Sequence, residues 1–255
     1  MKKLLRPLLI GLFLFSNFSA IAAIPQTISF ATEATYPPFE YIDAKGNMQG
    51  YDIDLAKALC EEMKVQCTFS NQPFDSLIPS LKLGKFNALI GALGITDARK
   101  QQVDFTDPYL AATASFVAPV ASHLTLSPDS LKEKTIGVQG GTTYEQYLAI
   151  DYKDIVKIKT YTSLQDALLD LNSGRIDAVL GDTPSITDWL QKHDTDKKYA
   201  LVGSAINNPK MFGVGYAIAV QKGNQELVDA FNAALKKIKE NGTYQKLNAT
   251  YFPEH

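Results

Sequence analysis

Short apolar runs alternate along the chain with segments of helical period. Three of these runs are typical of strands buried inside a sheet, and they cover residues 27–32, 68–71 and 86–90. Strands separated by helices are typical of parallel sheets that carry helices on both faces. The alternation therefore predicts an α/β protein with parallel sheets.

Two helices are predicted between these strands. Apolar positions four residues apart predict a helix over residues 55–63, and Asp52 has the chemistry to cap its N-terminus. A second helix is predicted over residues 74–83, with its end at Gly84, because glycine readily adopts the left-handed conformation that follows many helices. Residues 135–138 predict a further strand.

The sequence contains a weak internal repeat. Residues 81–91 read LKLGKFNALIG, and residues 171–181 read LNSGRIDAVLG. Each segment contains a helix end, a glycine, a basic residue and a short apolar strand. Any helix–glycine–strand unit has this form, and the alternative is a chain of two lobes built alike. The 255 residues are enough for two α/β lobes.

Ligands of open α/β sheets bind beyond the carboxyl ends of the strands, so the residues after each apolar run are candidates for a site. The candidates there are Glu33 and Tyr36, then Ala92, Gly94 and Arg99, then Gln139, Thr142 and Thr143, and finally Asp182. Thr142 and Glu145 have the spacing of a capping box, and the N–H groups of such a helix start attract a carboxylate.

Together these side chains are complementary to a zwitterion that carries a cationic side chain. Arg99 offers a planar fork for a carboxylate, and Asp182 accepts hydrogen bonds from an ammonium. Glu33 would pair with the distal cation between the rings of Tyr36 and Phe74. Plainer interpretations also exist: a surface arginine, an aspartate that caps a helix, and two core rings.

Composition argues against several other classes of protein. The formal charge is −2, so no basic surplus exists for a nucleic-acid backbone, and we expect no nucleic-acid partner. Three histidines and two cysteines are too few and too scattered for a zinc or haem motif. We therefore expect neither a metal nor a cofactor.

Residues 1–22 have the layout of a secretory signal peptide. A basic start precedes an apolar run at 8–15, and Ala20 and Ala22 occupy the small-residue positions of a cleavage site. The apolar run is short for a bilayer span, which argues against the alternative of a membrane anchor. Removal of the peptide leaves 22 basic and 27 acidic residues, a net charge of −5, on an exported protein.

Cys60 and Cys67 are the only cysteines. An oxidising compartment favours a disulfide, which would tie the 55–63 helix to the next strand and contribute roughly 2–3 kcal/mol by the loop-entropy model. The alternative of a redox-active pair lacks the Cys-x-x-Cys spacing.

Seven segments of the chain share their sequence and order with a known family. They read EATYPPFE at 33–40, GYDIDL at 50–55, FDSLIPSL at 74–81, ITDAR at 95–99, FTDPY at 105–109, GRIDA at 174–178 and NGTY at 241–244. As a set they resemble the polar amino-acid family of periplasmic solute-binding proteins, the ligand-capturing subunits of ABC importers. Residues 68–72 with Gln139 and Asp182 are most similar to the arginine-binding group, and next to the lysine/arginine/ornithine-binding group.

The resemblance implies a two-lobe periplasmic binding protein fold of type II, in which each lobe is a sheet flanked by helices. Lobe one would comprise residues 24–111 and 216–255, lobe two residues 115–206, and a two-strand hinge the crossovers at 112–114 and 207–215. The ligand would lie between the lobes, which close on it.

The resemblance also implies a role for each candidate residue at the amino-acid end of the ligand. Arg99 and Thr143 match groups that bind the carboxylate, and Asp182 matches the aspartate that binds the ammonium. Gly94 departs from the family, because relatives carry serine, threonine or aspartate there, and Ala92 replaces a serine. Losing one acceptor for the ammonium costs about 1–3 kcal/mol unless another group replaces it.

Four further residues match contacts to the ligand side chain. Tyr36 and Phe74 match the aromatic pair that encloses it. Glu33 stands where relatives bind the distal cation, and Gln139 matches a side-chain contact of the arginine-binding group.

The resulting hypothesis is a non-enzymatic protein, monomeric by analogy with the family. It captures a basic L-amino acid, arginine ahead of lysine, ornithine or histidine, and delivers it to an ABC permease of the inner membrane. Two alternatives share this fold: an exported cyclohexadienyl or arogenate dehydratase, and a sensor module that presents an amino acid to a membrane receptor. The enzyme would need a second anion-binding arginine near Glu33, and the sequence indicates none.

Overall fold

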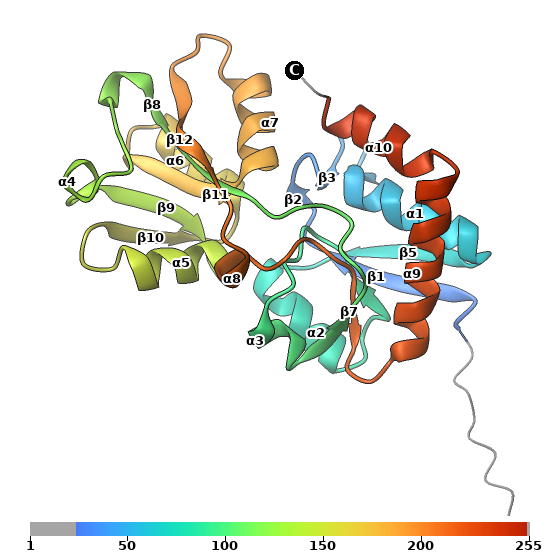
Figure 1. Ribbon diagram of the computed structural model, residues 1–255. Helices are drawn as coiled ribbons and strands as arrows, with labels where there is room; N and C mark the ends of the chain where they lie inside the picture. The colour runs from blue at the N-terminus through green and yellow to red at the C-terminus, as the bar shows by residue number, and fades with distance from the viewer. Residues whose placement is uncertain (1–23, 254–255) are drawn as a thin grey trace, which may run out of the picture.

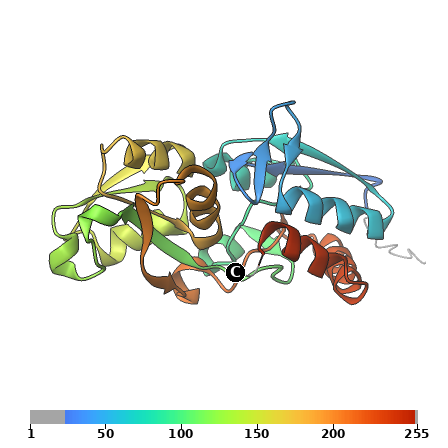
Figure 2. The same cartoon turned by 90° about the horizontal axis from the view of Figure 1, so that it is seen from above.

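The computed structural model describes residues 24–253, so the predicted signal peptide at 1–22 lies outside the described residues. Two lobes lie side by side, each built on a five-stranded sheet with helices packed on it (Figure 1). The view from above shows the same two bodies joined by a narrower middle (Figure 2). The predicted two-lobe α/β architecture is therefore confirmed.

The sheet of lobe one has the strand order β5-β1-β6-β13-β7. Its strands are β1 (Thr27–Thr32), β5 (Gln66–Asn71), β6 (Ala88–Leu89), β7 (Val103–Phe105) and β13 (Ala219–Gln221). A small separate sheet is formed by β2 (Thr35–Tyr36), β3 (Glu40–Ile42) and β4 (Met48–Gln49). The central strand β6 is shorter than the predicted strand at 86–90.

The sheet of lobe two has the matching order β10-β9-β11-β8-β12. Its strands are β8 (Ala114–Pro119), β9 (Thr135–Gln139), β10 (Lys157–Tyr161), β11 (Ala178–Asp182) and β12 (Tyr199–Ile206). The prediction of parallel sheets is wrong in one respect, because β13 and β8 run antiparallel to their neighbours. Both strands begin where the chain arrives from the other lobe, so they enter the sheet from the carboxyl ends of the parallel strands.

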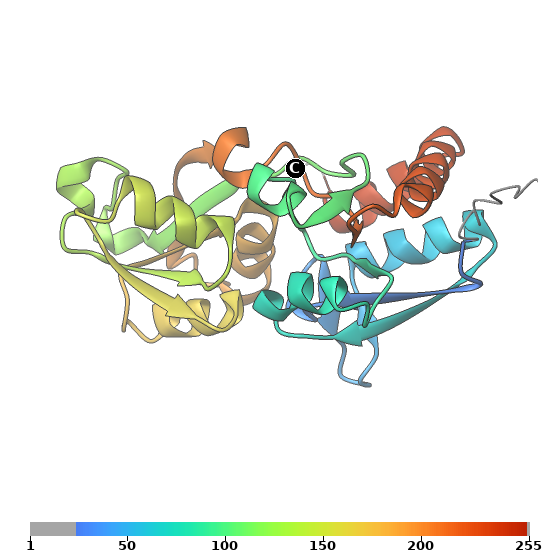
Figure 3. The same cartoon turned by 90° about the horizontal axis from the view of Figure 1, so that it is seen from below.

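The helices lie between successive strands, except the last two, which follow the final strand β13 (Figure 3). They are α1 (Tyr51–Met63), α2 (Leu77–Lys82), α3 (Asp97–Lys100), α4 (Pro128–Leu131), α5 (Thr143–Asp151), α6 (Leu164–Asn172), α7 (Thr183–His193), α8 (Pro209–Phe212), α9 (Gln225–Glu240) and α10 (Thr243–Tyr251), with 3-10 turns η1 (Phe74–Ser76) and η2 (Val120–Ser122). Helices α9 and α10 return to pack against α1 on lobe one. No helix among the described residues has the length and apolarity needed to cross a membrane.

The internal repeat corresponds to equivalent parts of the two lobes. Its two strands, β6 and β11, occupy the central position of their sheets. The glycines before them, Gly84 and Gly174, both have left-handed φ values, +70° and +67°. Asn87 accepts the amide of Ser29 in lobe one (2.9 Å), and Asp177 accepts the amide of Thr135 in lobe two (2.8 Å). The repeat therefore marks two lobes built alike.

Two of the expected helix starts have different outcomes. Thr142 caps α5 as predicted, because its hydroxyl accepts the Glu145 amide at 3.2 Å. Asp52 does not cap α1, which begins after Gly50 without a side-chain cap. The Asp52 carboxylate is instead fully buried and accepts the amide of Ala92 at 2.8 Å. The Asp52 side chain therefore pairs with the amide of Ala92, after β6, rather than with an amide of its own helix.

The predicted disulfide between Cys60 and Cys67 is present. It joins the C-terminal part of α1 to β5, with the two Cα atoms 6.1 Å apart. The bridge therefore fastens the first helix of lobe one to an edge strand of its sheet.

The chain passes between the two sheets twice, once after β7 and once after β12. On the lobe-one side of the two passages, the chain segments are joined by an antiparallel bridge between Leu110 and Tyr216. We propose the lobe and hinge bounds given above from the sequence, with crossovers at 112–114 and 207–215.

Candidate functional site

A cavity lies between the lobes. It is lined by all ten residues selected from the sequence: Glu33, Tyr36, Phe74, Ala92, Gly94, Arg99, Gln139, Thr142, Thr143 and Asp182. It is also lined by four residues that were not selected: Gly91, Tyr144, Phe212 and Tyr216. Residues that were selected because they follow predicted strands therefore lie around one cavity, although they are far apart in the sequence.

Lobe one supplies the cavity wall from three places. Glu33 follows β1, and Tyr36 lies on the short strand β2. Phe74 begins the turn η1. The segment from Gly91 to Gly94 follows β6, and Arg99 projects from α3 beyond it. Each of these groups stands at or beyond the carboxyl end of a parallel strand.

Lobe two supplies the opposite wall. Gln139 ends β9, Thr142 and Thr143 form the start of α5, and Asp182 ends β11. The first amides of α5 have no acceptor within their own helix, so they are donors for an anion in the cavity. The Thr142 hydroxyl accepts a hydrogen bond from the Glu145 amide at the helix start and donates one to the carbonyl of Gln139 at 2.7 Å.

Arg99 carries the one positive charge among the side chains that line the cavity. Its Nη1 donates to the Gly94 carbonyl at 3.1 Å, and its guanidinium carbon lies 5.7 Å from the centre of the Phe74 ring. It forms no salt bridge with any Asp or Glu in residues 24–253. Burial lowers the pKa of Arg99 to about 10, so it remains a cation at neutral pH.

Asp182 is buried at the junction of the two lobes. Although it precedes α7, its side chain makes no helix-capping bond. It accepts hydrogen bonds from the hydroxyls of Tyr36 in lobe one and Tyr144 in lobe two. Burial raises the pKa of Asp182 to about 7, and the two tyrosine hydroxyls oppose that rise. The plainer interpretation of Asp182 as a helix cap is therefore excluded.

Glu33 makes the second polar link between the lobes. Its carboxylate accepts from Gln139 Nε2 of lobe two at 2.7 Å and from the Thr35 hydroxyl at 3.0 Å. Burial raises the pKa of Glu33 to about 6, while the hydrogen bond from Gln139 acts in the opposite direction. Glu33 is therefore mostly ionised at neutral pH and offers a buried negative charge to the cavity.

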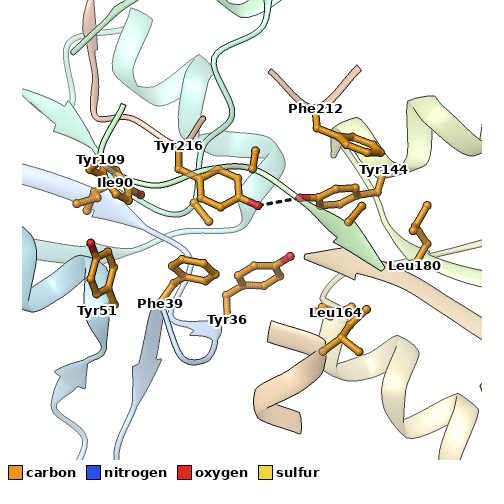
Figure 4. Close-up of a cluster of buried hydrophobic side chains, with 14 of the residues drawn as sticks. Tyr36, Phe39, Tyr51, Ile90, Tyr109, Tyr144, Leu164, Leu180, Phe212 and Tyr216 are labelled. Carbon is orange, nitrogen blue, oxygen red and sulfur yellow. Dashed lines mark hydrogen bonds between the residues drawn. The ribbon is translucent and has the colours of Figure 1, made fainter. Parts of the chain in front are cut away.

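The residues missed by sequence analysis form an aromatic group beside Asp182. The hydroxyls of Tyr144 and Tyr216 lie 3.2 Å apart, and Phe212 packs on Tyr144 with ring centres 5.1 Å apart (Figure 4). Tyr144 follows Thr143 at the predicted helix start, and this position could have identified it. Phe212 lies on the second crossover and Tyr216 directly after it. Both follow β12, a strand that the sequence analysis did not predict, so the residues beyond it were not searched.

The structure explains why position 94 is a glycine. A Cβ atom at Gly94 would lie 2.2 Å from the backbone carbonyl oxygen of Phe212. This oxygen belongs to backbone, so no side-chain rotation relieves the clash. The second crossover therefore occupies the space that a side chain at position 94 would need.

Because of this clash, Gly94→Ser is expected to weaken ligand binding at least tenfold rather than to restore an acceptor. Gly94→Ala should lose as much, since both carry the clashing Cβ and only serine carries a hydroxyl. Isothermal titration calorimetry of the two variants beside the unaltered protein measures this. Tighter binding by the serine variant would show that the crossover can retreat.

Two similar lobes, two crossovers and a polar cavity between the lobes define a two-lobed binding protein for a small charged ligand. The chain belongs to the bacterial extracellular solute-binding proteins, family 3, whose model matches residues 28–254.

Relatives with similar sequences cover nearly the whole chain. It is 48% identical to the arginine-binding periplasmic protein of Mannheimia haemolytica, over 97% of each chain. It is 46% identical to a putative ABC transporter arginine-binding protein 2 of Escherichia coli, over 94% of this chain and 96% of that one.

Solved structures show the same fold. An ancestral arginine-binding protein bound to arginine superposes with a TM-score of 0.83, at 38% identity, over 90% of this chain and all of that one. An ancestral amino-acid-binding protein described as a precursor of cyclohexadienyl dehydratase superposes with a TM-score of 0.79, at 32% identity, over 89% of this chain and 96% of that one.

Proposed function

We propose that this protein binds a basic L-amino acid, arginine ahead of lysine, ornithine or histidine, and delivers it to an ABC permease of the inner membrane. The observation that carries the proposal is the guanidinium of Arg99, without a salt-bridge partner among the described residues, in a cavity whose other charged side chains are Glu33 and Asp182. One cation and two anions are the complement of a carboxylate, an ammonium and a distal cation.

Each end of such a ligand has suitable groups in the cavity. The carboxylate would meet Arg99 and the first amides of α5 near Thr143. The ammonium would meet Asp182. The distal guanidinium would reach Glu33 and Gln139, with Tyr36 and Phe74 along the aliphatic part.

Capture requires no chemical step in this proposal. The ligand enters when the lobes are apart, and groups of both lobes contact it when they meet. Closure then creates a single surface across both lobes for a permease to recognise. The names of the arginine-binding relatives and the signal peptide predicted at residues 1–22 support a periplasmic location.

A ligand screen tests the proposal directly. The exported chain is unfolded, freed of copurified ligand, refolded and melted with each of the twenty amino acids, ornithine and citrulline. A ligand at 100 times its dissociation constant stabilises the folded state by about 2.7 kcal/mol, which is readily seen as a shift in Tm. We expect the largest shift with arginine; a larger shift with a neutral or acidic amino acid would contradict the side-chain assignment.

The dehydratase alternative draws support from the similarity to the enzyme precursor. Catalysis on a ring dicarboxylate would require groups for two carboxylates, and Arg99 is the one guanidinium that lines the cavity. Incubation with arogenate or prephenate and detection of the aromatic product decides between the two functions.

A further inference from the structure

Two acidic side chains lie together inside lobe one, behind the wall of the cavity. Glu40 on β3 is 1% exposed, and Asp52 in the first turn of α1 is 0% exposed. Neither lines the cavity itself. The Asp52 amide donates to the carbonyl of Phe39, the residue before Glu40, at 2.9 Å, and a negative charge on Asp52 acts directly on the Glu40 carboxyl group. A function limited to ligand contacts makes no use of this pair.

The hydrogen bonds around the pair require a proton. Asp52 Oδ2 accepts the Ala92 amide and the Tyr109 hydroxyl, each at 2.8 Å. Asp52 Oδ1 and Glu40 Oε2 are buried and meet no N–H or O–H donor within the described part of the chain. Two ionised carboxylates in this position would leave acceptors unpaired and like charges in contact, which is costly in a buried site.

The charged groups that act on Glu40 are themselves acidic. Glu33 and Asp182 are acidic and repel a negative charge on Glu40. Tyr109 contributes a neutral hydroxyl, and neither acid of the pair forms a salt bridge with a cation in residues 24–253. Burial raises the pKa of Glu40 well above its usual value and that of Asp52 to about 7.

The pair also supports the backbone that forms the cavity wall. Ala92 has φ +44°, a left-handed conformation that non-glycine residues seldom adopt, and its amide is held by Asp52. Next to it, a Cβ atom on Gly91 would lie 3.3 Å from Glu40 Oε1. Gly91, Ala92 and Gly94 all line the cavity. This part of the cavity wall is therefore hydrogen-bonded to Asp52 and lies close to Glu40.

We propose that Glu40 keeps its proton at neutral pH and shares it with Asp52, and that this acid pair positions the Gly91–Gly94 wall of the binding cavity. Glu40 and Asp52 are positioning residues, since they act on a ligand through the backbone of Ala92.

The shared proton is tested by stability against pH, without any ligand. A carboxyl group whose pKa is raised in the folded state stabilises the protein at low pH, and this contribution is lost as the pH rises above the unfolded value of 4.5. The unfolding constant of the unaltered protein is compared with that of Glu40→Gln at each pH. The ratio of the two constants should rise by up to tenfold per pH unit between pH 5 and 8.

Urea unfolding at each pH measures this constant. The matched control is Glu61→Gln, at an exposed position of α1, whose difference from the unaltered protein should not change with pH. An equally constant difference for Glu40→Gln would overturn the shared proton.

The positioning role is tested by arginine binding, and this arm rests on the proposed function. Asp52→Ala removes the acceptor of the Ala92 amide and should raise the dissociation constant at least tenfold. Asp52→Asn keeps one accepting oxygen, so its dissociation constant should stay close to that of the unaltered protein. The dissociation constant of Glu40→Gln should also stay close to that value. If Asp52→Ala fails to fold, a loss of arginine binding in the folded asparagine and glutamine variants would still overturn the positioning role.

The outcomes separate the two proposals. Failure of the unaltered protein to bind arginine would overturn the proposed function, while the pH experiment would still decide the shared proton. Equal loss of binding in the alanine and asparagine variants, both folded, would overturn the positioning role.

Discussion

Arg99→Ala is expected nearly to abolish amino-acid binding, with a rise of roughly 100- to 4,000-fold in the dissociation constant. Arg99 is the one positive side chain that lines the cavity, so its loss leaves a ligand carboxylate buried beside Glu33 and Asp182. Removing one partner of a buried ion pair costs about 3–5 kcal/mol, and each 1.4 kcal/mol is a factor of ten. Titration calorimetry with arginine measures the effect.

Two further variants sharpen this experiment. Arg175→Ala is the matched control, because Arg175 is an exposed arginine of lobe two that pairs with Asp170 outside the cavity. It should bind arginine as the unaltered protein does. Arg99→Lys keeps the charge but not the planar fork, and its affinity should lie between the two. Affinity in Arg99→Ala close to that of the unaltered protein would refute the proposed orientation of the ligand.

Glu33→Gln is expected to weaken arginine binding about 100-fold and to change the affinity for a neutral amino acid by less than about threefold. The variant keeps the shape of the side chain but removes the buried negative charge that would face the distal guanidinium. Competition assays with arginine and glutamine measure the ratio directly. Equal losses for both ligands would mean that Glu33 does not face the side chain.

The pH dependence of arginine binding follows from the same group. Burial raises the pKa of Glu33 to about 6, so acidification from pH 7 to pH 5 protonates it and removes its attraction for a cation. Arginine affinity should therefore fall as the pH drops through 6. Glu33→Gln should reduce this slope without abolishing it, because Asp182, with a pKa of about 7, also titrates in this range.

The sequence predicted which residues line the cavity better than it predicted the sheets that carry them. Glu33, Arg99, Gln139 and Asp182 were selected because they follow apolar runs, and such runs are parallel strands whose carboxyl ends meet at the cleft. This rule uses only local pattern and one general property of α/β folds. The disulfide was equally predictable, since the chain has only two cysteines.

Features that depend on tertiary contacts were not predictable in this way. The antiparallel direction of β8 and β13 depends on how the chain returns between lobes, which no local pattern encodes. Asp52 stands at the sequence position of a helix cap, but the buried Ala92 amide lies close enough to take its carboxylate. The glycine at position 94 is required by a carbonyl more than a hundred residues away, that of Phe212.

The hydrogen bonds from Tyr36 to Asp182 and from Gln139 to Glu33 have a consequence for the speed of capture. They join the lobes through the same polar groups that we assign to the ligand. An incoming amino acid must exchange with them rather than add to them, so the net gain is smaller than a count of its contacts suggests. Association then depends on how often the cleft opens, and its rate constant should lie below that of a permanently open site.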